Sequence, residues 1–172
     1  MELLTPFTDE KIRTLFPGDK IELTGVVYTA RDAAHERMYR AYREHTPPPF
    51  EYKGNAVFYA GPCPPPPGKV IGSIGPTTAG RMDAYSPVLI RAGLKVMIGK
   101  GSRNTAVIDA IKKHKGLYLV GVGGVAALMA KCIVKSEIVA YDDLGTEAIR
   151  RLEIVKLPLI VGIDHLGRSV YD

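Results

Sequence analysis

The sequence predicts an α/β domain built on a largely parallel sheet. In its second half, short apolar segments alternate with stretches of helical periodicity, an order typical of βαβ units. The chain has 172 residues, of which 46% are hydrophobic. A domain of this length buries about 70% of the surface that its unfolded chain exposes. We therefore expect residues 1–172 to form a single domain that needs neither disulfides nor a structural metal.

Capping residues and hydrophobic spacing place the elements of the first half. Thr8 precedes two acidic residues, which predicts a short helix that ends at the turn around Pro17. Alternation of period two predicts a strand over residues 20–29, and a spacing of about four predicts an amphipathic helix over 32–44. A short strand is also predicted over residues 55–60. The four prolines at 64–67 cannot donate backbone hydrogen bonds, so we expect a rigid extended connector there.

The second half continues this alternation. Apolar runs predict strands over residues 70–74, 94–98, 117–122, 138–141 and 159–163. Helical spacing predicts helices over residues 81–91, 105–114, 125–132 and 146–151. Because strands joined through a helix pair in parallel, most of the sheet is expected to be parallel.

Cationic and hydroxyl side chains follow three of the predicted strands. Arg31 and Lys100 each come shortly after a strand, and Thr77 and Arg81 lie in the segment Gly-Pro-Thr-Thr-Ala-Gly-Arg-Met-Asp at 75–83. Ligands bind at the carboxyl ends of strands in open α/β sheets, where helix N-termini attract anions. Three converging cations suit a small dianion. A dicarboxylate is the simplest candidate, because arginine binds a carboxylate through two hydrogen bonds.

Simpler structural interpretations stay open beside this one. Thr77 could cap the next helix, and an isolated arginine is usually a surface residue. The run Gly-Val-Gly-Gly-Val-Ala at 121–126, with Asp142 beyond it, also fits a dinucleotide-binding fingerprint. The chain after residue 121 holds little more than one βαβ unit, whereas a dinucleotide fold needs two halves. Tight packing of a helix on a strand is therefore the favoured interpretation of these glycines.

The cysteines and histidines are not spaced as metal ligands. Cys63 and Cys132 lie 69 positions apart without a Cys-x-x-Cys spacing, which argues against a zinc site. Cys132 lies in an apolar helical pattern and is expected to be a core residue, whereas Cys63 is expected to be an exposed loop thiol. His35, four residues after Arg31, is expected on the surface of its helix, with orientation of a site residue as the alternative. The other histidines are predicted to be helix C-terminal caps or solvated residues: His45, His114 and His165.

Charge and hydropathy argue against two classes of partner. The net charge is +5, but the basic residues form no run, so solvated helix faces are favoured over a nucleic-acid footprint. The uncharged stretch at 117–130 is too short for a membrane helix, and the first residues lack the pattern of a signal peptide. Two cysteines without a disulfide framework indicate a reducing compartment, and we expect a cytoplasmic protein.

The segment 75–83, with Tyr-Thr-Ala-Arg-Asp-Ala-Ala-His at 28–35 and Gly-Lys-Gly at 99–101, resembles the β subunit of class I iron–sulfur fumarate hydratase and of its relative L-tartrate dehydratase. The similarity covers nearly the whole chain. It implies a swivelling β/β/α domain with a largely parallel central sheet or barrel. It also implies half of a hydro-lyase active site, whose [4Fe–4S] cluster is held by three cysteines of a partner α subunit, in a homodimer or heterotetramer.

The resemblance also implies roles for four residues. Arg31, Arg81 and Lys100 match residues that hold the substrate carboxylates, and Thr77 matches a residue proposed as the catalytic base. The favoured reaction is the reversible hydration of fumarate to (S)-malate. L-Tartrate dehydration stays open, because both enzymes share these positions. A threonine hydroxyl is a poor base unless its alkoxide is stabilised, so base and helix cap both remain as interpretations of Thr77.

Overall fold

The computed structural model describes residues 1–121 and 126–172, which alternate between strands and helices. The strands are β1 (Glu2–Leu4), β2 (Lys20–Thr29), β3 (Ala56–Phe58), β4 (Val96–Gly99), β5 (Leu117–Gly121), β6 (Ile133–Ala140) and β7 (Ile149–Ile163). The α-helices are α1 (Asp9–Arg13), α2 (Asp32–Arg43), α3 (Ser86–Arg91), α4 (Thr105–His114) and α5 (Ala126–Lys131). Two 3-10 helices complete the set, η1 (Ala79–Met82) and η2 (Asp142–Glu147).

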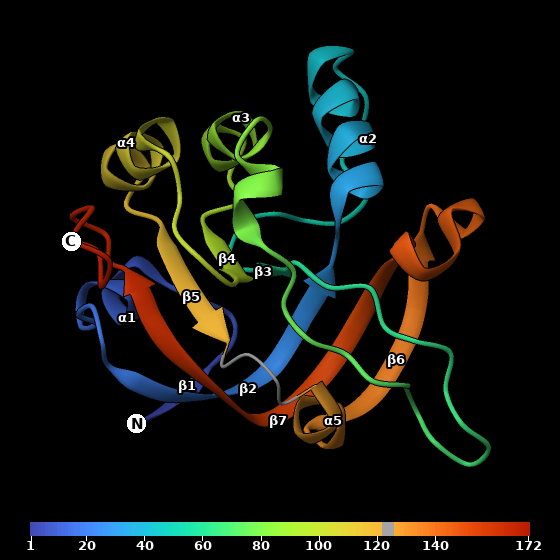
Figure 1. Ribbon diagram of the computed structural model, residues 1–172. Coiled ribbons are helices and arrows are strands. Elements are labelled where there is room, and N and C mark those ends of the chain that lie inside the picture. The colour runs from blue at the N-terminus through green and yellow to red at the C-terminus, as the bar shows by residue number, and fades with distance from the viewer. Residues whose placement is uncertain (122–125) are drawn as a thin grey trace.

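A closed five-stranded barrel forms the centre of the molecule (Figure 1). The sheet has the order β1-β2-β3-β4-β5-β7-β6, and a further pairing between β2 and β7 closes its middle five strands. Pairings along β1-β2-β3-β4-β5 are parallel, as predicted, whereas β7 is antiparallel to β2, β5 and β6. The long strand β7 therefore closes a barrel that is parallel on one side and antiparallel on the other.

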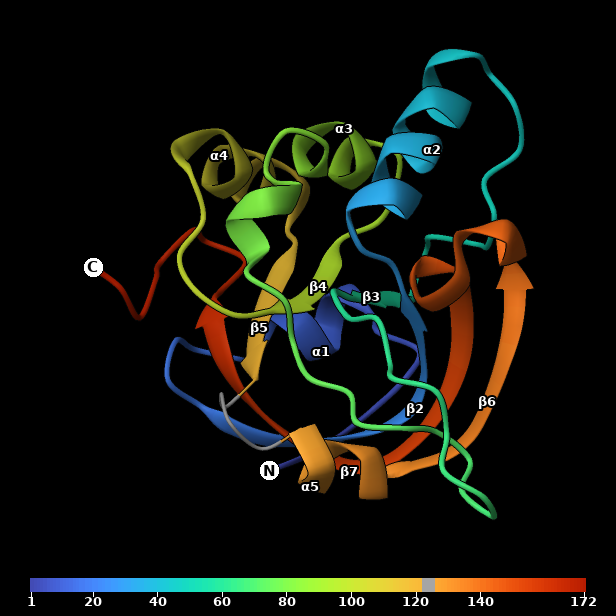
Figure 2. The ribbon, with the colours of Figure 1, turned by 45° about the vertical axis from the view of Figure 1, so that its right-hand side comes forward.

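Helices cover the outer face of the parallel strands. In both views α2, α3 and α4 lie together on one side of the barrel, and α5 lies at the opposite side (Figure 1 and Figure 2). Along β4, Val96 and Ile98 join a buried cluster that all five barrel strands share, and Met97 joins a second cluster with these helices. Because both faces of such a strand are covered, its sequence is apolar without interruption.

Two predicted elements are confirmed to the residue, the strand over 20–29 as β2 and the helix over 105–114 as α4. α4 has a side-chain cap, because the Asn104 Oδ1 accepts a hydrogen bond from the Val107 N–H at 2.9 Å. The predicted helix over 81–91 is instead divided into η1 and α3. Pro87 sits in the first turn of α3, where its missing N–H costs nothing, so α3 begins at Ser86.

The predicted strand over 70–74 and the predicted helix over 146–151 are both wrong. Ile71 and Ile74 are buried in the cluster that the barrel strands share, but no strand forms there. Apolar spacing indicates which residues are buried, and it does not show whether their backbone pairs with a neighbouring strand. Residues from Ile149 onward instead begin β7, since pairing with both β2 and β6 overrides a local helix preference. The short strand β1 was not predicted. None of the helices in the described residues is long and apolar enough to cross a membrane.

Candidate active-site surface

The parallel strands β2, β3 and β4 end next to one another, and the candidate residues follow these ends. Arg31 comes two residues after β2, and Lys100 comes directly after β4. Tyr59 and Gly61 follow β3, which lies between the other two strands. The carboxyl ends of neighbouring parallel strands therefore bring Arg31 and Lys100 to one edge of the barrel, as the sequence predicted.

The segment 75–83 adds Thr77 to this edge by pairing with the end of β4. The Thr77 N–H donates to the Tyr59 carbonyl at 2.6 Å, and the Lys100 N–H donates to the Thr77 carbonyl at 3.2 Å. The Ala79 N–H donates in turn to the Lys100 carbonyl at 2.8 Å. Backbone hydrogen bonds thus fix Thr77 and Lys100 beside each other.

Arg81 joins the site through an ion pair with the start of α2. Its Nη2 lies 3.1 Å from the Asp32 Oδ2, and the Arg81 side chain is 53% exposed. Asp32 is the residue after Arg31, so the ion pair between Arg81 and Asp32 connects η1 to the chain beside Arg31. The sequence analysis did not predict Asp32 as a site residue. Its position directly after Arg31 at a strand end would have indicated it.

Arg31 is the N-cap residue of α2, yet its side chain makes no capping bond. Instead the Glu147 Oε1, from η2, accepts a hydrogen bond from the Ala33 N–H at 3.1 Å. The Arg31 side chain lies across Gly61, where an added Cβ would be 3.1 Å from the Arg31 Cδ. The absent side chain at Gly61 therefore leaves the room that Arg31 occupies. Nothing in the local sequence indicated the contribution of Glu147.

His35 is buried behind Arg31, so the predicted location on the helix surface is wrong. Its side chain is 1% exposed, and the ring meets Tyr59 edge-on at 5.1 Å between centroids. The Nδ1–H donates to the Arg31 carbonyl at 2.8 Å, since a carbonyl oxygen can only accept. The alternative prediction, that His35 orients a site residue, agrees with this contact to the Arg31 backbone.

We expect the stability of the domain to fall between about pH 6.5 and pH 4 because of His35. Burial lowers the pKa of His35 to about 4. The unfolded chain takes up this proton near pH 6.5 while the folded chain does not, so acid favours unfolding by up to about 3 kcal/mol. Denaturant unfolding across this pH range measures the effect, and His35→Gln should remove this part of the pH dependence. His45→Gln, at an exposed histidine, is the control, and parallel curves for wild type and His35→Gln would contradict the expectation.

The helix that follows Thr77 is not capped by Thr77. The N-cap residue of η1 is Thr78, whose side chain makes no capping hydrogen bond. The interpretation of Thr77 as a helix cap is therefore wrong. Base catalysis and the positioning of a carboxylate remain as possible roles of its hydroxyl.

The glycine run at 121–126 lies mostly outside the described residues. Gly121 itself ends β5, and an added Cβ there would lie 2.8 Å from Pro76 Cγ and 3.3 Å from the Met129 methyl of α5. This contact confirms the packing interpretation for Gly121, because the strand end must approach both α5 and the segment 75–83 closely. Asp142, which belonged to the less favoured dinucleotide-binding fingerprint, is an exposed residue of η2.

The described residues offer no ligand set for an iron–sulfur cluster. Cys63 is exposed and Cys132 is half-buried, and across residues 1–121 and 126–172 no three His, Cys, Asp or Glu side chains gather as metal ligands. Two thiolates are too few for a [4Fe–4S] cluster, so this chain does not fit as its holder. Arg81 and Lys100 are exposed at this edge of the barrel, and Arg31 and Thr77 are half-buried there. We call these four residues the strand-end site.

The fold and this surface define an α/β barrel domain with a cationic site at its strand ends. The whole chain, residues 1–172, matches the fumarase C-terminus family and belongs to that family. It is 39% identical over 155 residues to the aerobic class I fumarate hydratase of Escherichia coli strain K12, covering 89% of this chain and 28% of that protein. It is 38% identical over 157 residues to fumarate hydratase 2 of Leishmania major, covering 90% of this chain and 28% of that protein.

A third relative has nearly the length of this chain. A protein of Methanocaldococcus jannaschii named "Putative L(+)-tartrate dehydratase subunit beta" is 32% identical over 171 residues, covering 96% of this chain and 88% of the relative. In contrast, the chain spans less than a third of the length of the fumarate hydratases that it matches.

Proposed function

We propose that this chain is the β-type part of an iron–sulfur hydro-lyase that reversibly hydrates fumarate to (S)-malate. The observation that carries the proposal is the meeting of Arg31, Arg81, Lys100 and Thr77 at the ends of three parallel strands. The names of the fumarate hydratase relatives support the reaction. We assign residues 1–172 to one fumarase/tartrate dehydratase β-type domain of the swivelling kind.

In this proposal the three cations hold the two carboxylates of a C4 substrate. Arg81 and Lys100 are exposed at the surface, so a dianion can reach them without unfolding any element. A guanidinium binds a carboxylate through two parallel hydrogen bonds, while an ammonium acts as a compact charge. Asp32 now neutralises part of the Arg81 charge, and a substrate carboxylate would compete with it for the same guanidinium.

Thr77 is the proposed acceptor of the proton that leaves C3 when malate is dehydrated. Its backbone is fixed by the hydrogen bonds with Tyr59 and Lys100, which limits where the hydroxyl can move. Positive charge on Arg81 and Lys100 favours the alkoxide over the neutral hydroxyl. The same positive charge orients the substrate, so one surface serves binding and proton transfer.

The second half of the site belongs, in this proposal, to a cluster-bearing α subunit. The lack of a cluster ligand set among residues 1–121 and 126–172 fits a site that is completed by another chain, and the relative named as a β subunit supports this division. The assembly would be a homodimer or heterotetramer in the cytoplasm.

L-Tartrate dehydration is the second candidate reaction, favoured by the match to nearly the full length of the tartrate dehydratase relative. Parallel assays of the assembled enzyme with (S)-malate and L-tartrate separate the two. A kcat/KM for tartrate above that for malate would select the second reaction.

We expect the purified chain alone to bind no [4Fe–4S] cluster and to show no hydratase activity. Anaerobic reconstitution with iron and sulfide, followed by the visible absorption spectrum, tests the first part. The fumarate absorbance assay tests the second, with and without the proposed α subunit. Stoichiometric cluster absorption or fumarate turnover by this chain alone would contradict the proposed division, and activity that appears only with the partner is the expected result.

A further inference from the structure

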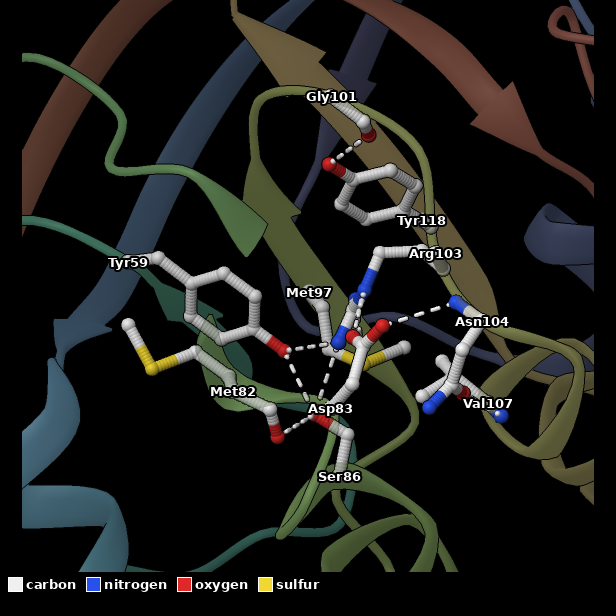
Figure 3. A network of polar contacts seen from close by, with 10 residues as sticks. All are labelled: Tyr59, Met82, Asp83, Ser86, Met97, Gly101, Arg103, Asn104, Val107 and Tyr118. Carbon is white, nitrogen blue, oxygen red and sulfur yellow. Dashed lines mark hydrogen bonds and ion pairs between the residues drawn. The ribbon is translucent and has the colours of Figure 1, made fainter. Parts of the chain in front are cut away.

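A fully buried arginine lies directly behind the strand-end site. Arg103 comes three residues after Lys100, and its side chain has no exposed surface. Its Nε donates to the Asp83 Oδ1 at 2.7 Å, and its Nη2 donates to the Ser86 Oγ at 2.8 Å and to the Tyr59 hydroxyl at 3.2 Å (Figure 3). A single guanidinium thus connects the residue after β3 with the end of η1 and the start of α3.

The segment 75–83, which ends at Asp83, carries Thr77 and Arg81 of the strand-end site, and Arg103 itself follows Lys100 after β4. Asp83 ends η1 and lies two residues after Arg81, while Tyr59 accepts the backbone hydrogen bond of Thr77. The second oxygen of Asp83 accepts a hydrogen bond from the Asn104 N–H at 2.8 Å. The Asp83 carboxylate therefore binds both the side chain of Arg103 and the backbone of the next residue.

Two tyrosine rings enclose the guanidinium. The Arg103 Cζ lies 5.2 Å from the Tyr59 ring centroid and 4.8 Å from that of Tyr118, and Figure 3 shows both rings around it. The Tyr118 hydroxyl donates to the Gly101 carbonyl at 2.8 Å, directly after Lys100. Gly101 has a φ of +83°, a conformation that glycine adopts without strain. Burial disfavours the charged guanidinium, yet the neighbouring tyrosines and Asp83 keep the pKa of Arg103 above its usual value.

We propose that Arg103 is a positioning residue that sets the placement of Lys100 relative to Thr77 and Arg81. A buried ion pair contributes little net stability compared with apolar residues of the same size, but its hydrogen bonds are directional. The planar fork of arginine binds Asp83 and Ser86 at fixed angles, which a lysine cannot do. The expected effect of Arg103 on substrate binding rests on the proposed function. Its expected effect on the backbone around Lys100 does not.

Hydrogen exchange of the full chain tests the backbone placement without any activity. The amides of Lys100 and Ala79 form the hydrogen bonds between β4 and the segment 75–83. Arg103→Lys keeps the charge beside Asp83 and should raise exchange at both amides by about tenfold or more. The Val161 amide, bonded to the Asp19 carbonyl on the other side of the barrel, should keep its wild-type rate.

Two further variants complete this experiment. Arg151→Met removes an arginine that pairs with Glu153 on β7, and it should leave both reporter amides unchanged. Ser86→Ala deletes one hydrogen bond of Arg103 and provides the measurement if Arg103→Lys does not fold, with a smaller rise expected at the same two amides. Wild-type exchange at Lys100 and Ala79 in the folded variants would overturn the proposal.

Kinetics of the assembled enzyme test whether Arg103 acts through Lys100. Arg103→Lys should raise the KM for fumarate by about tenfold, and in a Lys100→Met background it should change kcat/KM by less than about threefold. If Arg103 had a merely structural role, Arg103→Lys would lower kcat/KM by the same factor in the wild-type and the Lys100→Met proteins. That result would overturn the proposal. If the wild-type assembly hydrates no fumarate, the proposed function fails, while the exchange data still decide the role of Arg103.

Discussion

Replacing Thr77 by valine is expected to lower the kcat of the assembled hydratase by about 10²–10⁴-fold, the usual contribution of a general base. Valine keeps the branched shape and deletes the hydroxyl, so the backbone hydrogen bonds with Tyr59 and Lys100 can persist. Thr77→Ser retains the hydroxyl and should stay largely active. The KM should change little in both variants, because the lost group acts on the proton and not on the carboxylates.

Exchange of the malate C3 hydrogen with solvent deuterium is the decisive measurement for Thr77. The matched control is Thr78→Val, since Thr78 is the adjacent threonine and its exposed side chain makes no capping bond. The control should exchange this hydrogen at the wild-type rate and Thr77→Val should not. If Thr77→Val also exchanges it at the wild-type rate, Thr77 is not the base and the group lies in the partner chain.

Removing any one cation of the strand-end site should lower kcat/KM by well over tenfold. Loss of one partner from a desolvated charge pair costs about 2–5 kcal/mol, and the bound substrate with its partner subunit would desolvate this surface. The variants are Arg31→Met, Arg81→Met and Lys100→Met. Arg40→Met, which removes an exposed helix arginine paired with Glu36, should leave kcat/KM near the wild-type value.

The same variants should fold normally. Arg81 is 53% exposed and its ion pair with Asp32 is a surface pair, which contributes at most about 1 kcal/mol to stability. Thermal unfolding of the chain checks this before any kinetic assay. Near-normal kcat/KM in all three folded variants would show that the carboxylates are held elsewhere.

The sequence predicted both ends of the elements whose own residues define a start, an end and a periodicity. α4 combines an asparagine cap with helical spacing, and β2 combines period-two alternation with a turn before it, so both bounds were right. Residues 146–151 carry a local helix preference that β7 overrides by pairing on both edges. The closure of the barrel by β7 could not be predicted, because it depends on partners more than a hundred residues away, such as Tyr28 opposite Arg151.

The sequence by itself placed Arg31 and Lys100 after two parallel strands, because strand direction brings their carboxyl ends to one edge. Thr77 and Arg81 were assigned to the same edge through a strand over 70–74 that does not form, and hydrogen bonds and an ion pair bring them there instead. Only the tertiary structure decided what lies behind them. His35 is buried, Glu147 caps α2 and Arg103 joins Asp83, since each of these contacts depends on segments that only the folded chain brings together. Periodicity describes one element at a time, and these residues act between elements.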